Sequence, residues 1–140
     1  MSTVLIKGGT VINATGAGGA DVLVDGETIA AVLKPGSTLL GVDLEANVDE
    51  VVDAAGKYVI PGGIDPHTHM ELPFGGTQAS DTFETGTRAA AWGGTTTIID
   101  FAVQRYGERV EDGLATWHAK AAGNACIDYG FHMIVSDVRD

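Results

Sequence analysis

The sequence predicts an α/β chain in which a small β-rich module precedes the first units of a parallel β/α fold. Residues 1–55 contain short alternating apolar runs separated by glycine-rich turns. From residue 56 onward, strand-like and helix-like segments follow one another in turn. With 44% hydrophobic and 19% charged residues, the 140-residue chain has the composition of a globular protein that buries a core.

The β-rich module is recognised by its turn signals. Alternating apolar residues flank Gly8-Gly9, which predicts a turn there. Asp25-Gly26 separates two apolar runs and predicts a hairpin, because the type I′ turn needs positive φ. Lys34-Pro35-Gly36 predicts the next turn. We therefore expect residues 1–55 to form a small antiparallel β unit that contributes no chemistry of its own.

The second part of the chain alternates between strand and helix. Apolar or β-branched runs predict the strands, and a cap at Ser80 or Asp81 followed by alanines predicts the first helix. The expected order is β-α-β-α-β, over Tyr58–Ile60 (a buried strand), Ser80–Trp92, Thr95–Ile99, Glu108–Ala122 and Ile127–Val135. Such alternation predicts a parallel sheet with right-handed crossovers, whose working residues lie at the carboxyl ends of the strands.

Charge and cysteine content narrow the partners and the compartment. The 8 Lys and Arg against 19 Asp and Glu give a net charge of −11, which disfavours nucleic acid and anionic membrane surfaces. No basic apolar leader occurs, nor an apolar stretch of the roughly 18–20 residues that a membrane span needs. The single cysteine, Cys126, lies in an apolar setting, so we expect a buried, unreactive thiol and a soluble protein in a reducing cytoplasm.

A pair of histidines is the main chemical feature of the sequence. Residues 64–71 read IDPHTHME and directly follow a predicted strand. In an extended segment His67 and His69 direct their side chains to the same face, while Thr68 points away, so both imidazoles can bind one metal ion. Zinc suits imidazole, as do manganese, iron and cobalt. The alternative is a pair of loop histidines satisfied by hydrogen bonds.

Asp65 lies two residues before His67, so an extended segment directs it to the same face as both histidines. A carboxylate in this position can accept a hydrogen bond from a ligating imidazole and fix its tautomer, which is a role outside the direct ligand set. A turn or cap residue is the equally weighted alternative for Asp65. Pro66, Pro73 and the Gly62-Gly63 and Gly75-Gly76 pairs make the surrounding stretch rich in turns, unlike a segment that only fills a core.

The stretch from residue 53 to residue 101 carries a dense set of motifs. The broader set is Gly56-Lys57, Pro61-Gly62, Ile64-Asp65 and His67-x-His69. The narrower set is Leu72-Pro73-Phe74-Gly75-Gly76, Asp81, Gly86–Ala91, Gly93–Thr97 and Asp100-Phe101. With these motifs the stretch resembles the amidohydrolase superfamily and, within it, the dihydropyrimidinase and hydantoinase family. The likeness continues more weakly along the rest of the chain.

The resemblance implies a fold and an activity. It implies an N-terminal β-sandwich module, here residues 1–55, and the start of a (β/α)8 TIM barrel, here residues 56–140. Members of the family open dihydropyrimidine or 5-substituted hydantoin rings with two metal ions, usually zinc, which a carboxylated lysine and a hydroxide bridge. His67 and His69 are then metal ligands. Leu72 and Phe74 are expected to shape the pocket for the ring substituent, with packing of an ordered loop as the alternative. Relatives are commonly homotetramers.

Other parts of the family pattern have no match in this chain. His118 is expected on a helix surface or in packing, His132 in a structural role, and Lys120 as a solvated charge. Residues 56–140 are far fewer than the about 250 that a closed barrel takes, so we expect an N-terminal portion of a longer enzyme, inactive alone. No catalytic base is assigned. An isolated piece of parallel sheet would also leave open strand edges.

Three other interpretations stay open. A non-catalytic dihydropyrimidinase-like interaction protein would share the architecture, but such relatives typically lose the histidines. Allantoinase and dihydroorotase share the general histidine motif, but Leu72–Gly76 is more similar to the hydantoinase branch. A free-standing β-rich binding module is the third. The expected partner is a small cyclic amide.

Overall fold

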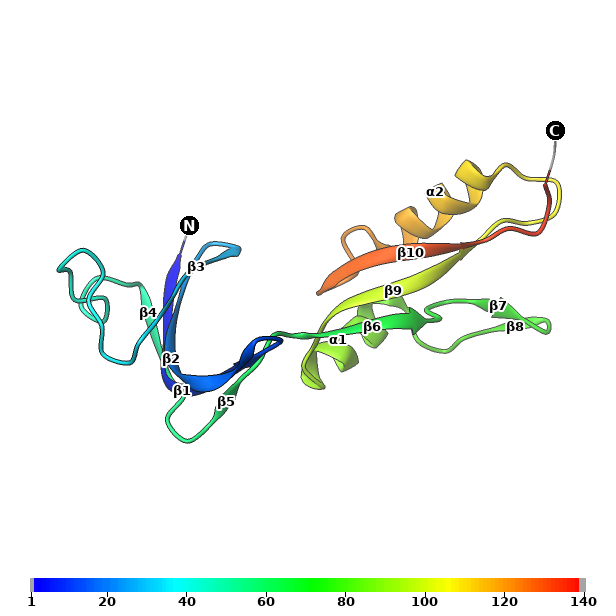
Figure 1. Ribbon diagram of the computed structural model, residues 1–140. Coiled ribbons are helices and arrows are strands. Elements are labelled where there is room, and N and C mark those ends of the chain that lie inside the picture. The colour runs from blue at the N-terminus through cyan, green and yellow to red at the C-terminus, as the bar shows by residue number, and fades with distance from the viewer. Residues whose placement is uncertain (1, 139–140) are drawn as a thin grey trace. The chain divides into compact units, whose positions relative to one another are not determined.

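A computed structural model describes residues 2–138 of the chain (Figure 1). The chain forms two compact units, Met1–Pro61 and Gly62–Asp140. Strands dominate both units, and two helices occur in the second. Neither helix of the described residues is long and apolar enough to cross a membrane.

The first unit is built on one five-stranded sheet. Its strands are β1 (Thr3–Asn13), β2 (Gly16–Asp25), β3 (Thr28–Leu33), β4 (Glu50–Asp53) and β5 (Tyr58–Val59). They lie in the order β3-β2-β1-β4, and β5 also pairs with β1. The expected antiparallel arrangement is wrong in one respect, because β4 and β5 run parallel to β1. Residues 34–49 return the chain to the start of β1, where Asp49 N–H donates to Thr3 O, so β4 sets off in the same direction.

Of the three turns predicted in the first unit, two are confirmed and one is wrong. Gly8-Gly9 is not a turn but an irregularity of β1, between Ile6 and Gly9 in the register with β2. The hairpin at Asp25-Gly26 is confirmed, although only Gly26 of the two loop residues takes a positive φ, which is more typical of a type II′ turn. The turn at Lys34 is also confirmed, since Ser37 N–H donates to Lys34 O.

One buried carboxylate connects the bulge and the turn. Asp21 is 7% exposed, and its two oxygens accept hydrogen bonds from Gly8 N–H and Gly36 N–H, both at 2.8 Å. Because neither glycine N–H is taken up by a strand ladder, the carboxylate stabilises a conformation that the backbone alone would leave unpaired. The apolar core of this unit lies beside it and contains Leu5, Leu23 and Leu44.

The short strand at residues 58–60 belongs to this first sheet. Tyr58 is 76% exposed and Ile60 65% exposed, so the expected buried strand is wrong. The reason is its partner: β5 pairs only along Thr10 and Val11 of β1.

The second unit contains a parallel three-stranded sheet with two crossover helices (Figure 1). Its elements are β6 (Gly63–Thr68), α1 (Phe83–Trp92), β9 (Thr95–Val103), α2 (Val110–Ala121) and β10 (Asp128–Ile134). The sheet order is β10-β9-β6, and both pairings are parallel. The β-α-β-α-β order is present, but its first strand is β6 and not the expected Tyr58–Ile60, which pairs with β1 in the first sheet. A small hairpin that the sequence pattern does not predict, β7 (Pro73–Phe74) and β8 (Thr77–Gln78), follows β6 and turns through Gly75 and Gly76, both with positive φ.

The core of the second unit lies between β9 and the two helices. Ile98, Asp100 and Ala102 are fully buried along β9, with the period of two that a strand imposes. Phe83 of α1 and Trp117 and Ala121 of α2 complete this core. Trp117 and Ala121 follow Gly113 at intervals of four residues, so they lie on one face of α2. The alternate residues of β9, such as Phe101, face the other side of the sheet.

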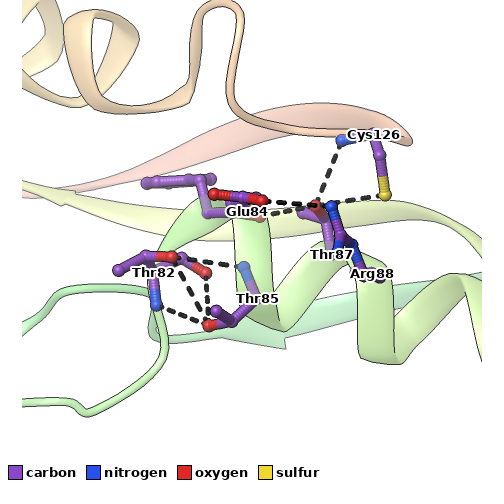
Figure 2. Close-up of polar contacts among 7 residues, drawn as sticks. Thr82, Glu84, Thr85, Thr87, Arg88 and Cys126 are labelled. Atoms are coloured by element: carbon purple, nitrogen blue, oxygen red, sulfur yellow. Dashed lines mark hydrogen bonds and ion pairs between the residues drawn. The ribbon is translucent and has the colours of Figure 1, made fainter.

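A reciprocal pair of hydrogen bonds begins α1 (Figure 2). The Thr82 hydroxyl accepts from Thr85 N–H at 3.2 Å, and Thr82 N–H donates to Thr85 Oγ1 at 3.0 Å. The cap is thus Thr82 and not Ser80 or Asp81. Farther along α1, Figure 2 shows Thr87 beside Cys126, whose N–H donates to Thr87 Oγ1. Cys126 is exposed, which corrects the expected buried thiol, because it precedes β10 in a loop.

The close approach of α2 to β9 predicts the effect of a methyl group at Gly113. A Cβ atom there would lie 2.8 Å from Val103 O and 2.8 Å from Met133 Cε, closer than packed atoms allow. Gly113→Ala should therefore lower the free energy of unfolding of the intact protein by about 1–3 kcal/mol in a urea titration. This loss should appear although alanine is favoured over glycine in a helix interior by about 1 kcal/mol. Ala115→Gly on the exposed face of α2 is the control, since it measures helix propensity alone; a more stable Gly113→Ala protein would contradict the packing.

Candidate metal centre

Two imidazoles converge at the carboxyl end of β6. His67 lies near the end of the strand and His69 just beyond it, and their Nε2 atoms are 3.2 Å apart. Both side chains are exposed. Thr68 points to the opposite side, where its hydroxyl donates to Asp100 Oδ2 at 2.9 Å. The structure therefore brings together the two histidines that the sequence pattern singled out.

The spacing of the two nitrogens fits a shared metal ion. Two ligands bound about 2.0–2.1 Å from one tetrahedral zinc ion lie about 3.4 Å from each other. The observed 3.2 Å between the Nε2 atoms is close to that separation, and it is also the length of a hydrogen bond between the two imidazoles, the alternative that the sequence pattern leaves open. Within residues 2–138, no group of three or more His, Cys, Asp or Glu side chains is placed to hold a metal ion, so the pair is the whole candidate ligand set of this part of the chain.

An aromatic ring supports both imidazoles. Phe101 of β9 lies with its ring centroid 4.5 Å from that of His67 and 5.1 Å from that of His69. On its other side, Phe101 contacts His132 of β10, with centroids 4.9 Å apart. His132 Nε2 lies 3.0 Å from Pro66 O, to which it can donate, so its contacts are those of a structural residue. The sequence analysis gave Phe101 no role. Its position was informative, because alternation along the strand places Phe101 on the face opposite to the buried residues of β9.

A buried carboxylate lies directly behind the histidine pair. Asp100 is 0% exposed, and four donors reach its two oxygens. Oδ2 accepts from Thr68 Oγ1 and from Met70 N–H at 2.7 Å, while Oδ1 accepts from Phe101 N–H at 2.8 Å and from Trp117 Nε1 at 3.2 Å. The sequence analysis placed Asp100 in a family motif but gave it no role, although a lone acidic residue within TTTIIDFAV was a signal. A carboxylate at a core-facing position must be hydrogen-bonded, so its presence in a predicted buried strand implies donor groups nearby.

Asp65 makes a local contact. Its Oδ1 accepts from the backbone N–H of His67 at 3.1 Å, an i to i+2 bond of the kind that the turn alternative implies. The register with β9 is irregular between Asp65 and Thr68, so equal parity does not place Asp65 on the side of the imidazoles. A role of Asp65 in orienting an imidazole stays a prediction.

Leu72 and Phe74 lie in different surroundings. Leu72 is half-buried and packs against the core that contains Phe83 and Trp117. Its carbonyl accepts from Ala79 N–H at 2.8 Å, which closes the base of the β7–β8 hairpin. Phe74 is 80% exposed near the tip of that hairpin. Their expected contact with a substrate stays a prediction.

Lys120 is not the solvated charge that its sequence position suggested. Its ammonium group donates to Glu71 O at 3.2 Å, lies 3.9 Å from Glu71 Oε2, and sits 4.2 Å above the ring of Trp117. Glu71 takes a positive φ of 52°, so Lys120 holds a strained residue next to the histidine segment. His118, an exposed residue of α2 two positions before Lys120, packs on Phe131 with centroids 5.0 Å apart, as expected for a packing residue.

The connections after β9 and β10 meet at the same edge of the sheet as the histidines. Gln104, 3% exposed, joins them: its Nε2 donates to Glu108 O and Asp137 O, and its Oε1 accepts from Ser136 N–H. A hollow of about 390 Å³ opens there, lined in part by Arg109 and Glu111. Arg109 Nε lies 3.3 Å from Glu111 Oε2. The hydrogen bond between the two side chains raises the pKa of the Arg109 guanidinium and lowers the pKa of the Glu111 carboxyl.

Comparison with known proteins places the chain among longer relatives. A family model described as Amidohydrolase family matches residues 50–125. The chain is 60% identical over 139 residues to a D-hydantoinase of Streptomyces coelicolor, which covers 99% of this chain and 29% of that protein. It is 44% identical over 136 residues to a dihydropyrimidinase of Rattus norvegicus, covering 94% of this chain and 25% of that protein.

Solved structures give the same relation. The dihydropyrimidinase from Brevibacillus agri NCHU1002 superposes with a TM-score of 0.88 at 52% identity, over 99% of this chain and 28% of that one. The L-hydantoinase from Arthrobacter aurescens superposes with a TM-score of 0.73 at 26% identity, over 94% of this chain and 27% of that one. The chain thus spans less than a third of the length of each of these four relatives.

The contacts of Lys120 predict a measurable loss when the side chain is removed. Lys120→Ala should lower the free energy of unfolding by about 1–2 kcal/mol, because a cation–π contact contributes about 0.5–2 and a hydrogen bond about 0.5–1.5. Lys120→Arg keeps a cation above Trp117 and should lose less than half as much. Lys57→Ala, at an exposed lysine, is the control and should change thermal unfolding little. Equal effects at Lys57 and Lys120 would show that the ammonium contacts contribute nothing.

Proposed function

The chain belongs to the amidohydrolase family, and from this premise we propose that the protein carrying it is a metal-dependent hydrolase of cyclic amides, of the dihydropyrimidinase and hydantoinase type. Its substrates are dihydropyrimidines or 5-substituted hydantoins. The observation that carries the proposal is the convergence of His67 and His69 at a strand end, in a chain similar along 99% of its length to a D-hydantoinase.

Each residue of the site receives a proposed role. His67 and His69 hold one divalent metal ion through Nε2; zinc suits the donor set, and manganese, iron or cobalt would also fit. A bound metal ion of this kind lowers the pKa of a coordinated water and polarises a carbonyl oxygen. Phe101 limits the rotation of both imidazoles by packing against them. Asp65 supports His67 through its backbone N–H.

The β7–β8 hairpin is proposed to face the ring substituent of the substrate. Phe74, exposed on the hairpin, would contact the substituent directly, and Leu72 would hold the base of the hairpin against the core and complete the pocket wall. The tight Gly75-Gly76 turn makes the hairpin short, which restricts how far Phe74 can move. These placements make the hairpin a determinant of which substituent fits.

We propose that the two parts of the chain belong to two larger domains of the whole protein. Residues 1–55 form part of a β-sandwich, and residues 56–140 form the start of a TIM barrel, with about three of its eight strands. The second metal ion, the remaining ligands and the general base come from the rest of the protein, so residues 1–140 alone should be inactive. The enzyme is proposed to be a cytoplasmic homo-oligomer, a tetramer by resemblance.

Two alternatives have less support. A non-catalytic dihydropyrimidinase-like interaction protein would not require two imidazoles with Nε2 atoms 3.2 Å apart. Allantoinase or dihydroorotase activity would use the same histidines, but the relatives with high identity are D-hydantoinases and dihydropyrimidinases.

Removal of either histidine tests the proposal. In the intact protein, His67→Ala or His69→Ala should lower the metal content per chain and reduce dihydrouracil hydrolysis by more than about 100-fold, since loss of residues that only orient a ligand already costs about 10–100-fold. Metal content is measured by elemental analysis and ring opening by loss of ultraviolet absorbance. His118→Ala, at the exposed packing histidine, is the control and should keep both. A histidine-pair variant with unchanged metal content and rate would refute the ligand assignment.

A further inference from the structure

We propose that Asp100 is the positioning residue that holds His67 and His69 at the spacing a single metal ion requires. The inference rests on the proposed function, because it assigns a purpose to the histidine pair. Asp100 touches neither imidazole in the structure, so it is not a catalytic residue. It acts through the backbone and through the neighbouring side chain on β9.

The first step is the pair of hydrogen bonds by which Asp100 holds the residues on either side of His69. Oδ2 accepts from the Thr68 hydroxyl at 2.9 Å and from Met70 N–H at 2.7 Å. These two donors belong to the residues immediately before and after His69. Because one oxygen atom holds the side chain of Thr68 and the backbone N–H of Met70, the segment that contains His69 is restrained on both sides. The separation of His69 from His67 then follows from the strand geometry of β6.

The second step is the rigidity of the carboxylate itself. Oδ1 accepts from Phe101 N–H at 2.8 Å and from Trp117 Nε1 at 3.2 Å, and Trp117 is only 4% exposed. The carboxylate is therefore anchored to its own strand and to α2 while it holds the histidine segment. A hydrogen-bond network that is fully satisfied in a buried site is rigid, because any movement would leave a donor unpaired.

The third step is the chemistry of the donors. All four groups that reach Asp100 are N–H or O–H donors, so only a side chain with two accepting oxygens satisfies them together. In Asp100→Asn the amide nitrogen would face one pair of donors with hydrogens of its own. The adjoining residue completes the arrangement, since Phe101 packs on both imidazole rings. Two consecutive residues of β9 thus control the backbone and the rings of the pair.

The test compares two threonines of the same unit, Thr68, which is half-buried, and Thr87, which is fully buried. Thr68→Val removes the hydroxyl that Asp100 holds beside the histidines. Thr87→Val removes a fully buried hydroxyl that bonds Phe83 O and Cys126 N–H, in α1 and away from the histidines. Each variant loses a hydrogen bond of a threonine hydroxyl, part-buried at Thr68 and buried at Thr87, so a loss of stability alone does not distinguish them. Asp100→Asn is made in parallel, and Thr68→Val keeps the test available if Asp100→Asn does not fold.

The readouts are metal affinity and a metal spectrum, both on the intact protein. Zn²⁺ is titrated into the metal-free protein in competition with a chromophoric chelator, and the visible absorption of Co²⁺ reports ligand geometry. Thr68→Val and Asp100→Asn should bind Zn²⁺ about 10–100-fold more weakly and show an altered Co²⁺ spectrum. Thr87→Val should keep the wild-type affinity and spectrum even though its thermal unfolding shifts downward.

Two results would overturn the inference in different ways. If the wild-type protein binds Zn²⁺ and opens dihydrouracil, but Thr68→Val and Asp100→Asn keep its affinity and spectrum, Asp100 is only a core residue and the proposed function stands. Asp100 also loses its positioning role if Thr87→Val weakens Zn²⁺ binding as much as Thr68→Val does. If the wild-type protein binds no divalent metal, the proposed function fails and the positioning role fails with it.

Discussion

The two faces of β9, the middle strand of the parallel sheet, have different roles: one packs in the apolar core and the other contacts the histidine pair. Its even-numbered residues from Ile98 to Ala102 are buried toward the helices, and Gln104, the first residue after the strand, is also buried. Its odd-numbered residue Phe101 lies against the imidazoles of His67 and His69. Because alternation along a strand is obligatory, the packing of the core and the placement of the candidate metal ligands are set by the same nine residues, Thr95–Val103.

The polar residues on the core side of β9 gather near its carboxyl end. Asp100 and Gln104 are both nearly inaccessible to solvent. Asp100 accepts from Met70 N–H in the segment after β6, and Gln104 donates to Asp137 O in the segment after β10. Every buried side-chain nitrogen and oxygen in residues 2–138 has a partner. A buried polar group costs free energy unless it is paired, so these residues join the connections at one edge of the sheet into a single arrangement. The edge they organise is the one that carries the histidine pair.

The residues around the pair divide between holding the site and reaching outward. Thr68 and Met70 bond to Asp100, and Lys120 holds Glu71 from α2. Beyond this anchored segment the chain enters a short hairpin in which Phe74 is exposed. A rigid base with an exposed tip suits a site in which metal ligands need fixed positions and a substrate-facing loop varies.

The sequence by itself determined the features that depend on neighbours along the chain. The helices and strands from α1 to β10, the hairpin at Asp25 and the turn at Lys34 follow from local patterns of side chains and turn residues. The candidate histidine pair was also visible, since alternation over three residues is a local property.

Only the tertiary structure decided the features that depend on distant partners. Asp100 meets Thr68 across 32 positions and Met70 across 30, and no local pattern specifies such contacts. The bulge at Gly8 exists because a strand partner and Asp21 accommodate it, where the same glycines alone suggest a turn. Lys120 bonds Glu71 across 49 positions because the second unit brings α2 beside the segment after β6, which a helical pattern alone does not reveal. Hydrogen-bond partners and ring contacts are properties of packed elements, so the groups that hold the site emerged only when the strands and helices were assembled.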